Sequence, residues 1–178
     1  MCGRLEWYVH NFFYGDYMAD TKATVLLFGY GNPGRLDDGL GPALIEAFEG
    51  KEFANVTLDA DYQLTVEDAV EVAKHDIVIF ADASVNGAEP FFFERLKPKD
   101  DVSFSTHGIE AEGVYGLAQQ LFDAKTKVYI LGIRGYEFNE FGQVLSEKAK
   151  ANLDKAIKFI ETALKKRNFD ELADLINN

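Results

Sequence analysis

Two acidic side chains and one imidazole occur at points of the chain where they could meet a cation. Asp38 stands beside Asp37 in the glycine-rich stretch 27–42, LFGYGNPGRLDDGLGP; Asp82 closes an apolar run, and His107 lies in a later polar loop. Asp38, Asp82 and His107 would offer two hard oxygens and one borderline nitrogen, which suit a divalent first-row transition ion such as nickel or zinc. Three protein ligands leave coordination positions open, so a substrate could reach the ion.

Each of these residues also has an ordinary structural role open to it. Asp38 could cap the following helix, Asp82 could be a turn residue after a strand, and His107 could be a loop histidine bonded to backbone. Taken singly, the structural roles are the simpler interpretation. Taken together they explain less, because the predicted fold brings all three residues to one edge of one sheet.

Strand and helix patterns alternate along the chain. Continuous apolar runs predict buried strands, and a stripe of apolar residues opposite lysines predicts a long final helix. The predicted strands are 24–28, 56–58, 77–80, 91–96 and 127–133, and the predicted helices are 41–48, 65–74, 113–122 and 144–167. The alternation predicts an α/β fold: one three-layer domain with a twisted, mostly parallel sheet of about five strands and helices on both faces. Ligands of such sheets bind beyond the carboxyl ends of the strands.

The glycine-rich stretch also fits a dinucleotide-binding motif. Residues 29–34 read G-x-G-x-x-G after a strand, and Asp59 ends the next strand, where a ribose-binding acid could sit. However, the later glycines and Pro42 delay the helix that should meet the pyrophosphate. Asp37 and Asp38 would also place two negative charges near the phosphates. The same carboxylates favour a cation as ligand, so the dinucleotide site is the weaker hypothesis.

Composition narrows the classes of partner. The formal charge is −12 over 178 residues, and without a cluster of Lys and Arg the chain is not expected to bind nucleic acid. Cys2 is the single cysteine, which excludes an intrachain disulfide and a cysteine-rich zinc site. No apolar run approaches the roughly 20 residues of a membrane span. We therefore expect a cytoplasmic protein without membrane attachment.

We expect three regions. Residues 1–20 are aromatic but lack the apolar core of a signal peptide, and are predicted to form a poorly ordered extension, with docking to a partner as the alternative. Residues 21–167 form the α/β domain, and residues 168–178 a C-terminal tail. The oligomeric state stays open, since a domain of this size can be a monomer.

The motifs of the chain resemble those of the maturation endopeptidases of nickel–iron hydrogenases. The resemblance rests on GYGN at 29–32, the DDG and GxG spacing at 37–41, FADAS at 80–84 and STHG at 105–108, and in element order it extends over 24–164. It implies a largely parallel α/β fold. It also implies a protease that removes a C-terminal peptide from the precursor of the hydrogenase large subunit after nickel insertion.

The resemblance places the metal-contacting and catalytic residues of the family on Asp38, Asp82 and His107. Many relatives carry Glu at the first position, and the segment 61–64 departs from a glycine-rich stretch that some relatives have. The nickel would arrive with the substrate, so that none is bound permanently. Gly31, Asn32, Asp37, Gly39 and Arg134 are candidates for contacts to the substrate or for positioning.

No nucleophile triad or HExxH helix competes with this metal-dependent peptidase hypothesis, because neither serine at 84 nor at 105 lies in a G-x-S-x-G setting. Two other classes of protein remain as alternatives. A nickel carrier without catalytic activity would use the same ligands but bind the ion tightly by itself, whereas a dinucleotide-dependent oxidoreductase would bind NAD(P).

Overall fold

The computed structural model describes residues 23–99, 104–105 and 108–176. Five strands form the main sheet in the order β2-β1-β3-β7-β4. The first four run parallel, and only β4 is antiparallel to its neighbour. The strands are β2 (Val56–Asp61), β1 (Val25–Tyr30), β3 (Ile77–Ser84), β7 (Lys127–Arg134) and β4 (Phe91–Arg95). The predicted fold class is confirmed.

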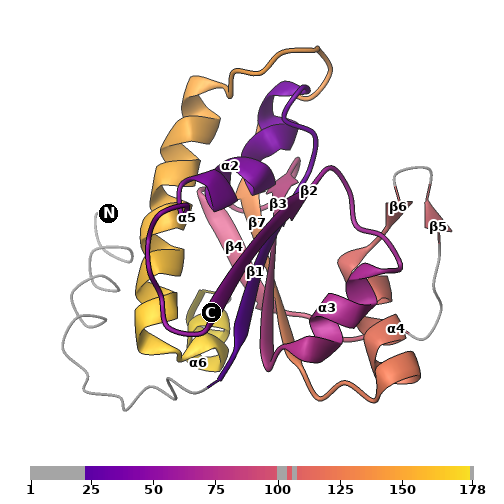
Figure 1. The fold of residues 1–178 in the computed structure, drawn as a ribbon. Coiled ribbons are helices and arrows are strands. Elements are labelled where there is room, and N and C mark those ends of the chain that lie inside the picture. Colours follow the sequence, from indigo (N-terminus) through magenta and orange to yellow (C-terminus); the bar gives the residue numbers. More distant parts are fainter. Residues whose placement is uncertain (1–22, 100–103, 106–107, 177–178) are drawn as a thin grey trace.

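Helices cover both faces of the sheet, as Figure 1 shows. On one face lie α2 (Leu40–Glu46), α5 (Glu147–Lys166) and α6 (Phe169–Ile176), and on the other α3 (Asp68–Lys74) and α4 (Ala111–Phe122). A short hairpin of β5 (Phe104–Ser105) and β6 (Gly108–Ile109) precedes α4. The three layers enclose two apolar clusters, one on each side of the sheet.

The central strands form where the sequence has no polar face. In β1 the residues VLLFG are buried throughout, because its neighbours on both sides are strands and both faces carry helices. Side chains alternate between the two clusters: Leu27 packs on the α2 and α5 side, and Leu26 and Phe28 pack on the α3 and α4 side. Phe28 and Phe80 meet edge to face with ring centroids 5.8 Å apart.

Gly29 and Gly41 allow β1 and α2 to touch. A Cβ atom on Gly29 would lie 2.3 Å from the carbonyl oxygen of Gly41, and one on Gly41 would lie 2.2 Å from the carbonyl oxygen of Tyr30. This close contact brings the turn between the two elements over the end of the sheet. Two glycines of the predicted motif therefore serve helix packing.

Several elements are longer or begin later than predicted. Strands β1, β3 and β7 each extend past their apolar runs, to Tyr30, Ser84 and Arg134, so that polar residues near the sheet end are held in regular strand. Helix α3 begins after Thr65, whose amide and hydroxyl both donate to the carboxylate of Asp68, at 2.7 and 3.1 Å. These hydrogen bonds hold the turn that leads into the helix.

The expected C-terminal tail contains helix α6, which buries Phe169, Leu172 and Ala173. The carboxylate of Asp170 ties it to the sheet, accepting from the Tyr129 hydroxyl and from Lys127, each at 2.6 Å. The amphipathic pattern of this segment continues the core that α5 begins. The expected extension 1–20 lies outside the described residues, and none of the described helices is long and apolar enough to cross a membrane.

Candidate active site

Asp82 and Tyr30 meet at the carboxyl ends of β3 and β1. The register pairs Gly29 with Ala81, so Tyr30 and Asp82 are the next residues along and share one face of the sheet. The phenol of Tyr30 donates a hydrogen bond to the Asp82 carboxylate, and the amide of Ala83 donates to the same side chain at 2.7 Å. The strand order changes direction between β1 and β3: after β1 the chain adds β2 on one side of it and then crosses to add β3 on the other side. Such a switch point is where open parallel sheets bind ligands.

Burial makes Asp82 reluctant to ionise. Its pKa is raised from 3.8 to about 7: desolvation is the largest cause and the negative charge of Asp38 adds to it, while the hydrogen bonds from Ala83 and Tyr30 lower the pKa. The pKa of Tyr30 also lies well above its usual value, because the phenol is buried and faces Asp82, Glu112 and Glu110. The site therefore concentrates negative charge in a poorly solvated place, where an arriving cation would be strongly favoured.

Asp38 reaches the same site from the turn between β1 and α2. Its Oδ2 accepts from the amide of Asn32 at 3.2 Å, while the Asn32 side chain accepts from the amide of Gly34 at 2.8 Å. Gly31 has a φ of +133°, and a Cβ atom there would lie 2.1 Å from the carbonyl oxygen of Asp38. Only glycine fits this close approach, so Gly31 lets the turn fold back and hold Asp38 beside Asp82.

Asp37 points the other way and has a structural role. Its side chain is fully buried and accepts from the amides of Tyr136, Glu137 and Ser146 and from the Ser146 hydroxyl, at 2.7 to 2.9 Å. Burial alone would raise its pKa, but these hydrogen bonds outweigh it and lower the pKa. A carboxylate with no exposed surface has none to offer a substrate. Asp37 instead joins the turn to the loop between β7 and α5.

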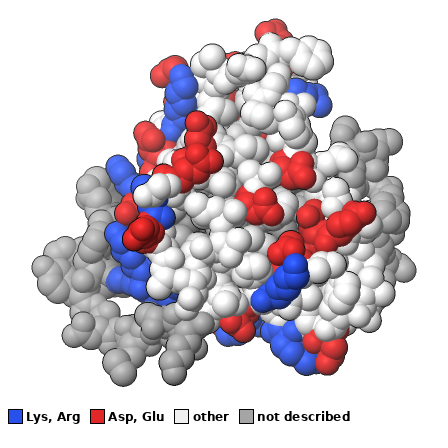
Figure 2. Space-filling view, in the orientation of Figure 1, with Lys and Arg blue, Asp and Glu red and all other residues white. Residues whose placement is uncertain are grey.

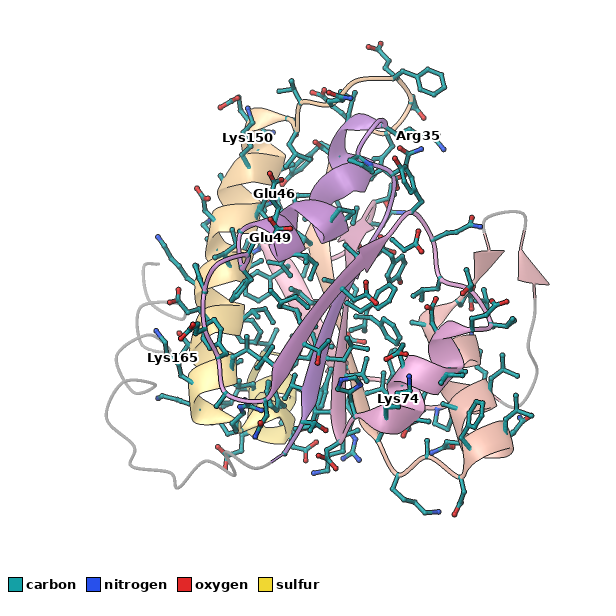
Figure 3. The ribbon with its side chains drawn as sticks, in the orientation of Figure 1. Arg35, Glu46, Glu49, Lys74, Lys150 and Lys165 are labelled. Atoms are coloured by element: carbon teal, nitrogen blue, oxygen red, sulfur yellow. The ribbon has the colours of Figure 1, made fainter. Side chains whose placement is uncertain are left out.

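That loop, residues 135–146, is held firmly beside the turn. Leu36 donates to the carbonyl of Gly142 at 2.9 Å, and Gly142 donates to the carbonyl of Gly34, also at 2.9 Å. Arg35 projects at the upper end of the molecule beside this loop (Figure 3), and its guanidinium approaches the carbonyl of Phe138 at 3.4 Å. Phe141 at the tip of the loop is 92% exposed.

Two further residues expected at the substrate lie around this end of the sheet. Gly39 packs against Pro33, where a Cβ atom would lie 2.8 Å from the proline Cα. Arg134 donates from Nη1 to the carbonyl of Gly87 at 3.1 Å, and its guanidinium lies 5.4 Å from the centre of the Tyr136 ring. The Nε of Arg134 is buried without a hydrogen-bond partner among the described residues. Arg134 is thus directed toward the β3–β4 loop.

His107, the third expected ligand, lies outside the described residues. Strand β6, which begins at the next residue of the sequence, leads into α4, whose first turn carries Glu112. Glu110 is engaged by Lys99 at 2.5 Å. Among the described residues no group of three or more His, Cys, Asp and Glu side chains is arranged to hold a metal ion, and the pair Asp38 and Asp82 supplies two carboxylates.

Tyr30 is the functional candidate that sequence reasoning missed. It lies inside the GYGN motif, but only the register of β1 against β3 reveals that its hydroxyl faces Asp82. A longer prediction for the two strands would have found it, because extending β1 to Tyr30 and β3 through Asp82 places these two side chains on the same face of the sheet. Tyr30 orients the carboxylate and contributes a donor in a site otherwise rich in acceptors.

The chain was compared with known protein families, curated proteins and solved structures. No protein-family profile matches the chain, and no curated protein matches its sequence. Solved structures do match. The NiFe hydrogenase maturation protease HycI from Thermococcus kodakarensis is 21% identical, with a TM-score of 0.63 over 88% of this chain and 94% of that one. The hydrogenase maturating endopeptidase HybD from E. coli is 21% identical, with a TM-score of 0.62 over 82% and 94%.

A third structure, the hydrogenase 2 maturation peptidase from a Thaumarchaeota archaeon, is 23% identical with a TM-score of 0.60 and covers 80% of this chain and 99% of that one. The three relatives come from different organisms, and each is matched over nearly its whole length. The chain therefore has the fold of the NiFe hydrogenase maturation proteases.

Proposed function

We propose that this protein is an endopeptidase that removes the C-terminal peptide from the nickel-loaded precursor of a nickel–iron hydrogenase large subunit. The observation that carries the proposal is the convergence of Asp38 and Asp82 at the sheet switch point, on the fold of the hydrogenase maturation proteases. Two carboxylates in one poorly solvated place repel each other, and a cation between them relieves that repulsion. Burial is the main cause of the raised pKa of Asp82, and the charge of Asp38 adds to it.

The nickel is part of the substrate in this proposal. Asp38 and Asp82 contribute one carboxylate each, and His107 contributes an imidazole nitrogen, so the enzyme meets the ion with three ligands only when the precursor brings it. Nickel binding would displace the proton that burial favours on Asp82. Recognition of the substrate thus depends on metal loading, because an empty precursor leaves the carboxylates facing each other.

The chemistry proposed is hydrolysis of a peptide bond close to the ion. Nickel acts as a Lewis acid that polarises the carbonyl or a nearby water. The side chains of this chain position the ion: Tyr30 holds the Asp82 carboxylate by a hydrogen bond, and the Asn32 amide holds Asp38. The close approach of Gly31 to the Asp38 backbone keeps the turn folded, so that Asp38 stays at the site. Arg134 and Asn32 are proposed to contact the tail of the substrate.

The surface agrees with a cation-seeking role. On the face drawn in Figure 2, acidic side chains are spread over the left, the middle and the right, and basic side chains lie mostly at the left and lower margins. The formal charge of −12 points the same way. We place the protein in the cytoplasm by this proposal, where a precursor would be processed.

The test is to incubate the protein with nickel-loaded and with nickel-free precursor and to follow the mass of each precursor. We expect loss of a short C-terminal peptide from the loaded form alone. Cleavage of neither form would refute the proposal. Tight binding of free nickel by the protein, without cleavage, would instead support a nickel carrier.

A further inference from the structure

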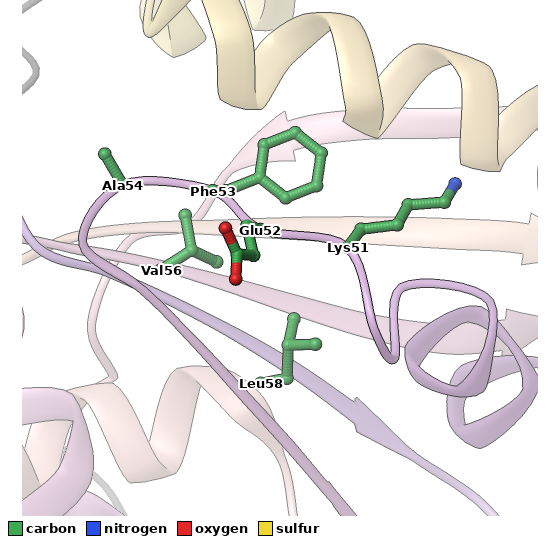
Figure 4. A pocket seen from close by; sticks show the side chains of 6 residues that line it. All are labelled: Lys51, Glu52, Phe53, Ala54, Val56 and Leu58. Atoms are coloured by element: carbon green, nitrogen blue, oxygen red, sulfur yellow. The ribbon is translucent and has the colours of Figure 1, made fainter.

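A groove runs along the outer edge of β2, beside the first residues of that strand and the segment that precedes it. It has a volume of about 620 Å³ and is lined by Lys51, Glu52, Phe53, Ala54, Val56 and Leu58. Figure 4 shows the Phe53 ring lying between β2 and α5, with Val56 and Leu58 on the same side of β2. These three apolar side chains pack against the core and are only partly buried.

The lining is poorly suited to a polar small molecule. A site for a polar small molecule brings several polar groups together around the ligand. In this groove Lys51 already interacts with other residues of the protein: its ammonium lies 4.9 Å from the centre of the Phe48 ring and 3.9 Å from a Glu161 carboxylate oxygen. The apolar floor of the groove instead suits apolar side chains.

The backbone along the outer edge of β2 bears on what could fill the groove. Within the described part of the chain β2 pairs with β1 alone, and the residues Thr57, Asp59, Ala60 and Asp61 are exposed. An open edge strand presents a row of free N–H and C=O groups, which proteins usually cover. A segment of extended chain that fills the groove would also pair with this edge.

The first described residues lie beside the groove. Arg167, at the end of α5, donates from Nη1 to the carbonyl of Ala23 at 3.0 Å and from Nη2 to the carbonyl of Ala54. Val25 donates to the carbonyl of Asn55 at 2.9 Å. One guanidinium therefore joins the point where the chain enters β1 to the wall of the groove, and residues 1–22 precede this point in the sequence.

The composition of those residues matches the groove. Residues 1–22 contain six aromatic side chains: Trp7, Tyr8, Phe12, Phe13, Tyr14 and Tyr17. Aromatic side chains bury large apolar areas, and a short tether gives a segment an effective concentration on the order of millimolar at its own site. A partner from solution would have to compete with that concentration.

We propose that the aromatic segment 1–22 docks in the groove at the outer edge of β2, packing its rings on Phe53, Val56 and Leu58. The segment enters β1 where β2 begins, so it runs antiparallel to β2 and extends the sheet by one strand. Docking covers the open edge and completes the core on the α5 side. This inference does not depend on the proposed function.

The chain carries its own probe, since Trp7 is its only tryptophan. Ala54→Glu adds a carboxylate at an exposed point of the groove wall and leaves the core untouched. We expect the emission of Trp7 in the native chain to be blue-shifted and protected from acrylamide. In Ala54→Glu it should shift to longer wavelength and quench more strongly. The matched control Ala88→Glu, in the exposed β3–β4 loop, should leave both unchanged.

Hydrogen exchange gives a second readout. Replacing Phe12→Ser and Phe13→Ser changes no described residue, and should speed amide exchange in residues 56–61 without lowering the unfolding midpoint of the α/β core. Equal Trp7 emission in the native chain and Ala54→Glu, with equal exchange in the serine variant, would overturn the proposal. Emission that depends on protein concentration would also overturn it, because a second copy would then fill the groove.

Discussion

Asp82→Asn is expected to make the metal-free protein more stable at neutral and alkaline pH. The substitution keeps the size of the side chain and keeps an oxygen that accepts from Ala83 and Tyr30. It removes the negative charge that burial and Asp38 oppose. A residue retained at the expense of stability is the expected signature of a functional site.

The magnitude follows from the pKa of Asp82. The folded-state value of about 7 lies above the ordinary value of 3.8, and at about 1.36 kcal/mol per pKa unit this difference corresponds to at most about 4 kcal/mol. Above pH 7 the carboxyl is ionised in both states, and the folded state carries the whole cost. As pH falls from 7 toward 3.8, the folded state takes up the proton first, and the cost fades.

The assay is urea unfolding of the native chain and of Asp82→Asn at several values between about pH 5 and pH 8. We expect the variant's advantage in free energy of unfolding to be largest at the alkaline end and to shrink as the solution becomes acidic. A difference that is independent of pH, or a variant less stable than the native chain at the alkaline end, would refute the reasoning.

A control with the opposite sign is available on the same sheet. Asp76 accepts from the amide of Thr24 at 2.7 Å and from its hydroxyl at 2.9 Å. Hydrogen bonds from Thr24 lower its pKa. Stability from Asp76 is therefore present above its ordinary pKa and is lost as pH falls through the folded-state value. Asp76→Asn should not stabilise the protein at any pH.

Three other substitutions test neighbouring parts of the account. Asp38→Asn removes the charge that helps to raise the pKa of Asp82, so a carboxyl titration followed by carbon NMR should show the Asp82 midpoint moving down; an unmoved midpoint would mean that the two side chains do not interact. Asp37→Ala leaves buried amide donors without an acceptor and should lower the free energy of unfolding by about 3 kcal/mol or more, and a loss below 1 kcal/mol in urea unfolding would show that the loop 135–146 does not depend on it. Phe141→Ser, at a position 92% exposed beside the turn, should raise KM for precursor cleavage with little change in kcat or unfolding midpoint, while an unchanged KM would show that Phe141 does not contact the precursor.

The fold could be predicted because its signals are local. Apolar runs without a polar face and an amphipathic final helix require a sheet covered on both sides, and the right-handed crossover rule then leaves few topologies. Helix α6 was not predicted, because the segment is short and has few apolar residues. It is held on the sheet by hydrogen bonds from Lys127 and Tyr129 to Asp170, and these residues are more than 40 positions away in the sequence.

The candidate site could be predicted only in part. Asp38 and Asp82 were predicted because each follows a strand whose end the sheet must bring to the same edge. Asp37 and Asp38 are neighbours in sequence but point in different directions because of the backbone geometry at Gly31 and in the 3-10 turn Leu36–Gly39. The Asp38 carboxylate points toward Asp82, and the Asp37 carboxylate points into the loop 135–146. Tyr30 depended on a strand register that alternation in sequence does not specify.

The most direct test of the central claim compares three proteins on one substrate. Nickel-loaded precursor is incubated with the native chain, with Asp82→Asn and with Asp38→Asn, and its intact mass is followed. We expect loss of the C-terminal peptide with the native chain and an unchanged precursor with both variants, although Asp82→Asn is the more stable protein. Cleavage by either variant at the native rate would contradict the role of the carboxylate pair.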